Sequence, residues 1–452
     1  MTVSNETKAD GLVAGSAAVD LTPQSSVFLF GYPHVPRYST GVSDPLLCTA
    51  FYLRGEGGCV LFLANDLIFV PKPVAARVRR RIASRASIPE ECIIATATHT
   101  HSGPMTVDYV SNATDPAVPR VDPEYLRLIE ERMVLAGLAA IERAVPAELG
   151  LASATTTGLG GNRHDPSGPA DPEVPVVLAR TRSGGVPIAC MVVCAMHPTV
   201  LHEDSLLISG DFPGFTRRFL HDGVLPPTCG FLFHNGASGN QSPRHVTRGN
   251  TLAEARRLGE ILGRSVRGAI SQMEFSSRIP VACGHGFVEM SPRKFVAEAE
   301  AVEGLRAARE RLARLRAEGA PRHEVRTAEC DLFGAEETVE LTRAAADGRI
   351  EAAVAACSPA EIQVVRLGSR IFATWPGEFF VEYALALKAS EPSSHVITMA
   401  NGELQGYIVT AESAARGDYE AGNAIFSHEN GTRVVAETLR LIRAVGGTGG
   451  GA

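Results

Sequence analysis

Two histidines, His99 and His101, are separated by one residue in the run Ala-Thr-His-Thr-His-Ser-Gly-Pro, which closes an apolar segment. If that segment is a strand, both imidazoles project from one face, because alternate side chains of a strand point the same way. Neutral imidazole is a common zinc ligand and a common general base. The spacing predicts two ligands of one metal ion, or one ligand beside one base; the structural alternative is a satisfied polar pair.

Two further segments place polar residues at the ends of apolar runs. His197 closes the run before Pro-Thr, and Asp211 follows in a Gly-Asp-Phe-Pro-Gly turn, where it is a candidate helix cap or ligand partner. The loop 235–243 is rich in small residues that can expose N–H groups to an oxyanion. Ser238 and Ser242 in this loop are candidate nucleophiles, although an ordinary Asn/Gly/Ser loop is the simpler interpretation.

A glutamate and two tyrosines complete the polar set. Glu378, in Trp-Pro-Gly-Glu-Phe, has apolar neighbours, and a buried carboxylate needs a partner such as a metal ion. A helix cap is the usual role of a glutamate in such a place. Tyr407 and Tyr419 are, on composition alone, ordinary core or surface aromatics.

Strands and helices must alternate to position these residues, which predicts an α/β fold of mixed α+β layers, with central sheets flanked by helices. One segment differs, because 292–356 is rich in Ala, Glu and Arg, which predicts two or three helices. We expect these helices to form a solvated insertion, or less readily a lid or a contact in a homo-oligomer. Strands are expected at 59–70 and 92–101 and in the runs PVVLAR, PIACMVVCAMH, CGFLFHNG, IQVVRLGSRIFATWPG and SHVITMANG; helices are expected at 73–87, 214–221, 250–273 and 379–389.

The bulk composition is that of a globular protein, with 45% hydrophobic and 21% charged residues. We expect one domain over 15–445, a flexible tail at 1–14 and a Gly-rich tail at 446–452. The net charge of −7 and the lack of a basic block, apart from an arginine-rich helix face at 77–85, exclude nucleic acid as the main partner. No signal peptide or transmembrane segment is visible, and nine cysteines without CxxC spacing indicate a cytoplasmic protein.

Taken in order, these segments resemble the catalytic domain of the neutral (non-lysosomal, alkaline) ceramidases from about residue 15 to 427. The Thr-His-Thr-His-Ser-Gly-Pro run is the most specific motif, and the segments Gly31-Tyr32 and Asp44-Pro45-Leu46 extend the likeness. The resemblance implies a layered α/β enzyme with one zinc ion per chain. It makes His99, His197, Glu378 and Tyr407 the zinc ligands.

The same resemblance assigns four catalytic positions. His101 becomes the histidine beside the metal or the general base, and Arg163 and Tyr419 hold the substrate carbonyl and the developing oxyanion. Ser242 falls on the family's serine, in Gly-Asn-Gln-Ser-Pro-Arg where the family has Gly-Asp-Val-Ser-Pro-Asn. It attacks directly or orients water, and the sequence leaves both roles open.

The resemblance does not reach the C-terminal β-sandwich domain of those ceramidases, which are typically secreted or membrane-associated. We therefore expect a zinc-dependent amide hydrolase that acts on an N-acylated or amide-linked small molecule more readily than on ceramide. An ester or lactone hydrolase is the alternative within enzymes. A non-catalytic zinc protein that binds a ligand is the alternative outside them, although such a protein would not need the whole set of catalytic and ligand residues.

Overall fold

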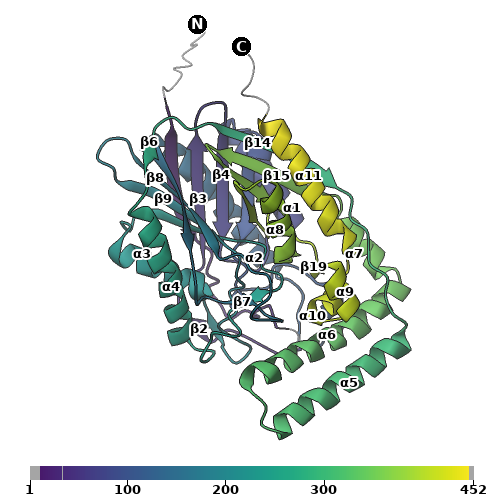
Figure 1. Ribbon diagram of the computed structural model, residues 1–452. Helices are drawn as coiled ribbons and strands as arrows, with labels where there is room; N and C mark the ends of the chain where they lie inside the picture. The colour runs from purple at the N-terminus through teal and green to yellow at the C-terminus, as the bar shows by residue number, and fades with distance from the viewer. Residues whose placement is uncertain (1–10, 33, 447–452) are drawn as a thin grey trace.

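Two sheets form the centre of the computed structural model, which describes residues 11–32 and 34–446 (Figure 1). The smaller sheet has the order β14 (Val281–Val288), β15 (Ala360–Leu367), β16 (Arg370–Thr374) and β18 (Ser394–Ile397). The larger has nine strands, with β13 (Phe275–Ser276) paired to β6 and the others in the order β11 (Gly230–Asn235), β9 (Pro187–Cys194), β8 (Glu173–Thr181), β6 (Val145–Thr155), β1 (Val13–Asp20), β3 (Leu47–Arg54), β4 (Cys59–Asn65) and β5 (Ile93–Ala97).

Alternation along the strands of the large sheet separates its two faces. In β3, Phe51 and Leu53 join the apolar cluster shared with the small sheet, whereas Ala50 and Tyr52 face the helices on the other side. The fold is therefore layered, with helices outside both sheets, as the sequence predicted. The large sheet is covered by α1 (Lys72–Ala86), α2 (Pro123–Glu142), α3 (Asp211–Gly223) and α4 (Leu252–Ile270), and the small sheet by α8 (Val381–Ser390) and α11 (Glu429–Gly446).

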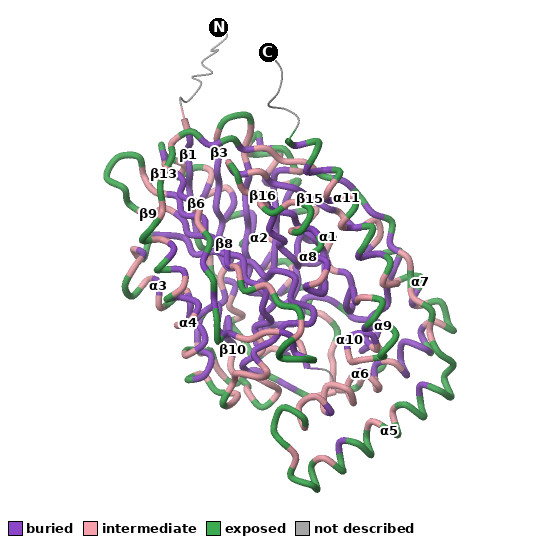
Figure 2. Tube along the Cα trace, in the orientation of Figure 1, coloured by how far each residue is buried: buried purple, intermediate pink, exposed green. Residues whose placement is uncertain are grey.

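The segment 292–356 contains the expected helices, α5 (Glu298–Ala317), α6 (Arg322–Ala346) and all but the last residue of α7 (Arg349–Cys357). α5 lies at the outside of the molecule and is largely exposed, whereas α6 lies between α5 and the body (Figures 1 and 2). α6 packs against α10 (Tyr419–Asn423) and η2 (Val110–Asn112). Of the two long helices of the insertion, α6 thus provides the main attachment to the body. A contact between copies at this segment stays a prediction.

The two edge strands of the large sheet, β5 and β11, lie next to each other although they are at opposite ends of the strand order. The side chains of Thr96 in β5 and His234 in β11 are joined by a 2.8 Å hydrogen bond. The chain after β18 closes the remaining space, because the N–H groups of Thr398 and Asn401 donate to carbonyls of β11 and β5, each over 2.7 Å. This closure brings the carboxyl ends of β5, β9, β11 and β18 to one place.

Several boundaries differ from the sequence prediction. β4 ends at Asn65 rather than at residue 70, because the apolar residues that follow form a buried turn, which periodicity alone does not distinguish from a strand. Val13 and Ala14, expected in a tail, belong to β1, and Gly446 ends α11. Gly11 and Leu12 of the predicted tail are also described, and Leu12 is buried. Residues 1–10 and 447–452 of the two predicted tails lie outside the described residues.

Within the described part of the chain, no helix is long and apolar enough to cross a membrane. The remaining short elements are β2 (Gly41–Val42), η1 (Glu90–Cys92), β7 (Gly161–Asn162), β10 (Leu207–Ile208), β12 (Gln241–Ser242), β17 (Glu378–Phe379), β19 (Tyr407–Ile408) and α9 (Ala411–Arg416).

Candidate active site

His99 is fixed by the buried turn that follows β4. Its N–H donates to the carbonyl of Leu67 over 2.8 Å, and its Nδ1 lies 2.9 Å from the carbonyl oxygen of Ile68. Because a carbonyl only accepts, Nδ1 carries the proton and Nε2 presents a lone pair. His99 and His101 both follow the end of β5, and His99 has a left-handed φ of 68°. The expectation that strand alternation aligns the pair is therefore wrong, since a constrained turn does so instead.

His197 and His101 are held in the same tautomer by carbonyls. Nδ1 of His197 lies 2.6 Å from the oxygen of Ser238, and Nδ1 of His101 lies 3.0 Å from the oxygen of Gly31. The three Nε2 atoms converge, with those of His99 and His101 only 3.3 Å apart. All three lie within 4.8 Å of one another.

Glu378 completes this cluster from β17, which belongs to a separate two-stranded sheet with β19. Its Oε2 lies 3.0 Å from Nε2 of His197 and 3.3 Å from Nε2 of His99. β17 and β19 pair in parallel with Glu378 opposite Tyr407, so both side chains face the same side. The Tyr407 ring lies 6.5 Å from that of His197, centroid to centroid. Three of the four predicted metal ligands are thus in direct contact, and the fourth lies beside them.

The donor set fits a metal cation. Burial lowers the pKa of His101 and of His197, so both imidazoles stay neutral. Lone pairs and a carboxylate aimed at one point repel each other unless a positive charge lies between them. Imidazole nitrogen with one carboxylate oxygen is the donor set that zinc takes in catalytic sites.

A buried arginine stands next to this cluster. Arg163 follows β7, and its N–H donates to the carbonyl of Asn240 over 2.9 Å. Its guanidinium carbon lies 5.3 Å from the ring centre of Tyr407 and 5.6 Å from that of Tyr419. Nε donates to Glu420, while Nη2 has no hydrogen-bond partner among the described residues. Arg163 therefore keeps a buried donor free for a substrate oxygen.

The charge of this arginine is maintained by its partners. Burial by itself would lower the pKa of Arg163, but the Glu420 carboxylate and Tyr407 raise it well above the ordinary value. Glu420 is affected in the opposite direction, because Arg163 and His164 outweigh its burial and hold its pKa at about 2. The pKa of Tyr407 and that of Tyr419 are raised, first by burial, so both hydroxyls remain proton donors.

The loop 235–243 supports the cluster with carbonyls more than with N–H groups. Ser238 and Gln241 both direct their carbonyl oxygens at Nδ1 of His197. Ser242 Oγ accepts a bond from the N–H of Arg244 over 3.3 Å, and no imidazole in the described chain lies within hydrogen-bonding distance of it. Ser242 nevertheless lines the same cavity as His101 and Arg163.

Asp211 supports the segment that follows His197. It is not a helix N-cap, since Gly210 occupies that position of α3. Its carboxylate accepts the N–H groups of Val200 and Leu201 over 3.0 and 2.9 Å. The turn after His197 is therefore fixed from below, which agrees with the role of ligand partner considered from the sequence.

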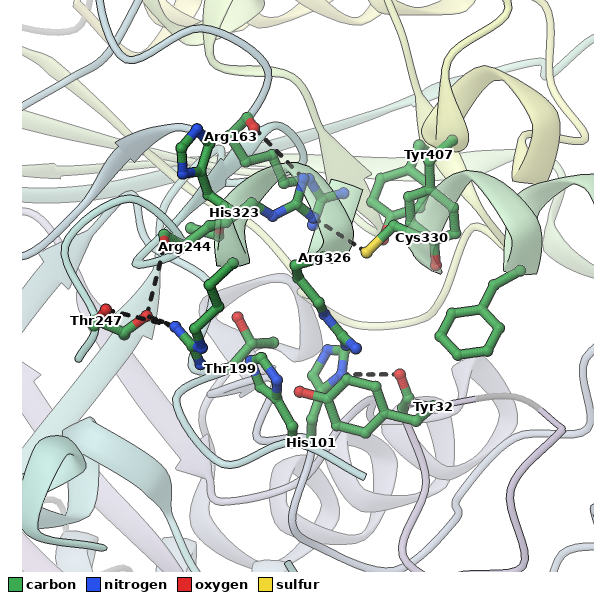
Figure 3. A pocket seen from close by; sticks show the side chains of 16 residues that line it. Tyr32, His101, Arg163, Thr199, Arg244, Thr247, His323, Arg326, Cys330 and Tyr407 are labelled. Atoms are coloured by element: carbon green, nitrogen blue, oxygen red, sulfur yellow. Dashed lines mark hydrogen bonds between the residues drawn. The ribbon is translucent and has the colours of Figure 1, made fainter. Parts of the chain in front are cut away.

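The cluster lies beside two neighbouring spaces that share part of their walls. The outer cavity, with an empty volume of about 680 Å³, contains His101, Arg163, Ser242, Tyr407 and Tyr419 on its wall (Figure 3). An inner recess of about 410 Å³ is lined partly by aromatic and aliphatic residues, among them Phe30, Ile68, Phe69 and Tyr109.

Sequence reasoning missed Glu337, a buried carboxylate of α6 on the wall of the inner recess. Its neighbours on the buried stripe of α6 are Ala328, Leu341 and Ala344, so it occupies a position where an apolar residue is expected. Burial raises its pKa to about 8. Also missed were three arginines of the outer cavity, Arg244, Arg322 and Arg326.

Comparison with known proteins identifies the fold. No family model and no curated protein sequence matches the chain. The neutral ceramidase from Pseudomonas aeruginosa is similar in structure with a TM-score of 0.74 at 18% identity, over 96% of this chain and 74% of that one. A ceramidase complexed with C2 gives a TM-score of 0.72 at 16% identity, over 96% and 75% of the two chains. The predicted resemblance to ceramidases is confirmed for the fold.

Proposed function

We propose that this chain is a zinc-dependent amide hydrolase with a ceramidase-like centre. The observation that carries the proposal is the convergence of three Nε2 lone pairs and the Glu378 carboxylate on one point. Carbonyls of Ile68, Gly31 and Ser238 fix the proton of each imidazole on the far nitrogen. Such outer partners are typical of histidines at metal sites.

One zinc ion would be held by His99, His197, Glu378 and Tyr407. When bound, it would polarise the amide carbonyl and lower the pKa of water towards about 7. The contacts of Glu378 with both histidines, and its register with Tyr407, support this set of ligands. In catalytic sites three protein ligands and a weak fourth leave room for a further oxygen.

His101 would act as the general base in this reaction. Its Nδ1 is occupied by the Gly31 carbonyl, so Nε2 is the atom that accepts the proton of the attacking water. The same Nε2–H would then donate that proton to the departing nitrogen. The base keeps one orientation throughout, because its other nitrogen stays bonded to the backbone.

Arg163 and Tyr419 would stabilise the negative charge that develops on the carbonyl oxygen. Arg163 carries the unpartnered Nη2 donor, and the raised pKa of Tyr419 keeps its hydroxyl protonated. Ser242 has no base beside it, which favours the orientation of water over direct attack. None of the nine cysteines, all described, forms a disulfide, which supports action in a reducing compartment such as the cytoplasm.

The test combines metal analysis with a panel of amides. We expect about one zinc per purified chain, loss of hydrolysis on chelation, and recovery on adding zinc. The panel runs from N-acyl sphingoid bases to short N-acyl amino acids, with matched esters and lactones. His99→Ala is expected to lose both zinc and hydrolysis, while Arg314→Gln, on the exposed side of α5, should lose neither.

A metal-free active enzyme would end the proposal. Cleavage of the esters or lactones alone would assign the site to the alternative hydrolase. Zinc binding with no turnover on any of them would favour the ligand-binding alternative.

A further inference from the structure

The outer cavity is lined by basic residues and by no acidic ones. Of its 16 lining residues, four are arginines and three are histidines, and none is Asp or Glu. Figure 3 shows Arg163, Arg244 and Arg326 gathered around the space above His101. The basic residues are Arg163, Arg244, Arg322, Arg326, His101, His202 and His323.

Two of these arginines have carboxylate partners behind the cavity wall. Arg163 is paired with Glu420, as described above. Arg326 lies 2.8 Å from Glu203 and 3.0 Å from Glu329, and its side chain is only 12% exposed. Their charges are therefore compensated inside the protein.

Arg244 and Arg322 have only neutral partners. Arg244 donates to the hydroxyl of Thr327 over 3.3 Å and to the sulfur of Cys330 over 3.1 Å. Arg322 donates to the hydroxyl of Thr247 over 3.3 Å and to the side chain of Asn250. No carboxylate of the described residues lies within 4.0 Å of either guanidinium. Both cations are thus held in place without a carboxylate in direct contact, and the Asp331 carboxylate interacts with Arg244 only at longer range.

The positive charge of the arginines lowers the pKa of a histidine in the same wall. His202 is half-buried, and its pKa is lowered to about 2, first by burial and then by Arg326, Arg322 and Arg244. The three arginines therefore act together on one point of the cavity. A space of this kind favours an anionic ligand over a neutral one, because arginine side chains form charge-assisted hydrogen bonds with carboxylates and phosphates.

We propose that the substrate is an amide that carries an anionic group, a carboxylate or a phosphate, which binds between Arg244 and Arg322. The inference rests on the proposed hydrolase function and adds the substrate class. With the amide placed between His101 and Arg163, the anionic group lies toward the first turns of α6. The helical insertion then selects the substrate, and a neutral ceramide leaves both cations unpaired.

Hydrolysis of three matched amides tests the substrate class. N-octanoylglycine carries a carboxylate, O-phospho-N-octanoylethanolamine a phosphate, and N-octanoylglycinamide neither. We expect kcat/KM for at least one anionic amide to exceed that of the neutral one by roughly 10- to 100-fold, the usual effect of hydrogen bonds to a charged group. Whichever anionic amide is faster identifies the group. Equal rates on all three would overturn the inference and leave the proposed hydrolase standing.

Binding without turnover separates the two proposals. N-octylsulfonylglycine and its glycinamide are sulfonamides that resist hydrolysis, and their Kd values can be measured by calorimetry on the zinc-loaded protein. We expect Arg244→Gln and Arg322→Gln each to raise the Kd of the carboxylate probe by roughly 10-fold or more. Neither variant should change the Kd of the amide probe. Arg314→Gln, an exposed α5 arginine outside the cavity, is the matched control.

The choice of variants keeps the test informative if one of them does not fold. Arg322 is exposed, so its replacement provides the measurement if the half-buried Arg244 variant does not fold. Arg244→Lys, which keeps the charge, should recover part of the affinity for the carboxylate probe. Equal binding of the two probes by the unaltered protein, or an equal loss of both in Arg322→Gln, would overturn the inference whether or not any amide is hydrolysed.

Discussion

Replacement of His101 by alanine distinguishes two interpretations of the histidine cluster. The Nε2 atoms of His99, His101 and His197 all lie within 4.8 Å of one another, so a metal ion bound by three imidazoles is one geometric solution. Glu378 favours the other, because its Oε2 contacts His197 and His99, and no contact with His101 is formed within 4.0 Å. We therefore expect His101→Ala to keep zinc and lose turnover.

The size of both effects follows from the contacts. A general base contributes about 10²- to 10⁴-fold to the rate, which corresponds to about 3–5.5 kcal/mol of activation free energy at 1.36 kcal/mol per tenfold. The variant leaves the bonds from His99 to Ile68 and from His197 to Ser238 in place, and His101 makes no bond to the N–H of either ligand. Zinc affinity should therefore fall by less than the roughly 10- to 100-fold typical of lost outer partners.

The assay measures zinc per chain by mass spectrometry after dialysis, together with kcat/KM on the best amide of the panel. His99→Ala is the positive control for zinc loss, and His221→Ala, on α3 away from the cavity, should change neither quantity. If His101→Ala lost zinc as completely as His99→Ala, His101 would be a ligand and the proposed base would be removed. Undiminished turnover would refute the base just as directly.

Three further perturbations test the surroundings of this centre. Gly31→Ala should retain zinc and lose most turnover, measured by the same assay, because φ is 115° there and a Cβ would lie 2.4 Å from Nδ1 of His101. Arg163→Lys, which removes the unpartnered Nη2 donor, should lower kcat by about 10²- to 10³-fold with zinc unchanged, and a near-normal rate would exclude that donor from the reaction. Burial raises the Glu337 pKa from 4.5 to about 8, so the stability from its protonated form is present below pH 4.5 and lost as pH rises through 8. Urea titrations give the unfolding free energy of the protein and of Glu337→Gln at each pH. The difference between the two should fall by up to about 5 kcal/mol over that pH range, and parallel pH curves would contradict this pKa.

The sequence predicted the residues of the site better than their orientation. Position at or after the end of an apolar run singled out His99, His197 and Glu378 one by one, and the resemblance to ceramidases joined them into one set of ligands, which the structure brings into contact. Their meeting could not be predicted, because β5 and β11 are opposite edges of one sheet until Thr398 and Asn401 join them. That closure depends on curvature of the whole sheet, which no local pattern encodes.

The contribution of α6 was missed for a related reason. Its composition is evenly mixed in charge, and a solvated insertion was the simplest interpretation of 292–356. Arg322 and Arg326 are four residues apart and therefore share a face, which was a usable signal for a basic stripe. What turns that face into a cavity wall is the packing of α6 against α10, a tertiary contact between segments about 80 residues apart.

The supports of the centre and of the outer cavity are separate. The histidines are fixed by carbonyls of Gly31, Ile68 and Ser238, all outside α6. Arg244 and Arg322, by contrast, are anchored through the contacts between α6 and the segment 242–250. Loss of either cavity arginine should therefore raise KM for an anionic amide and leave kcat unchanged, since the anion is bound equally in ground and transition states. A fall in kcat alone would instead mean that α6 acts on the centre through Glu337, its one carboxylate on the wall of the inner recess.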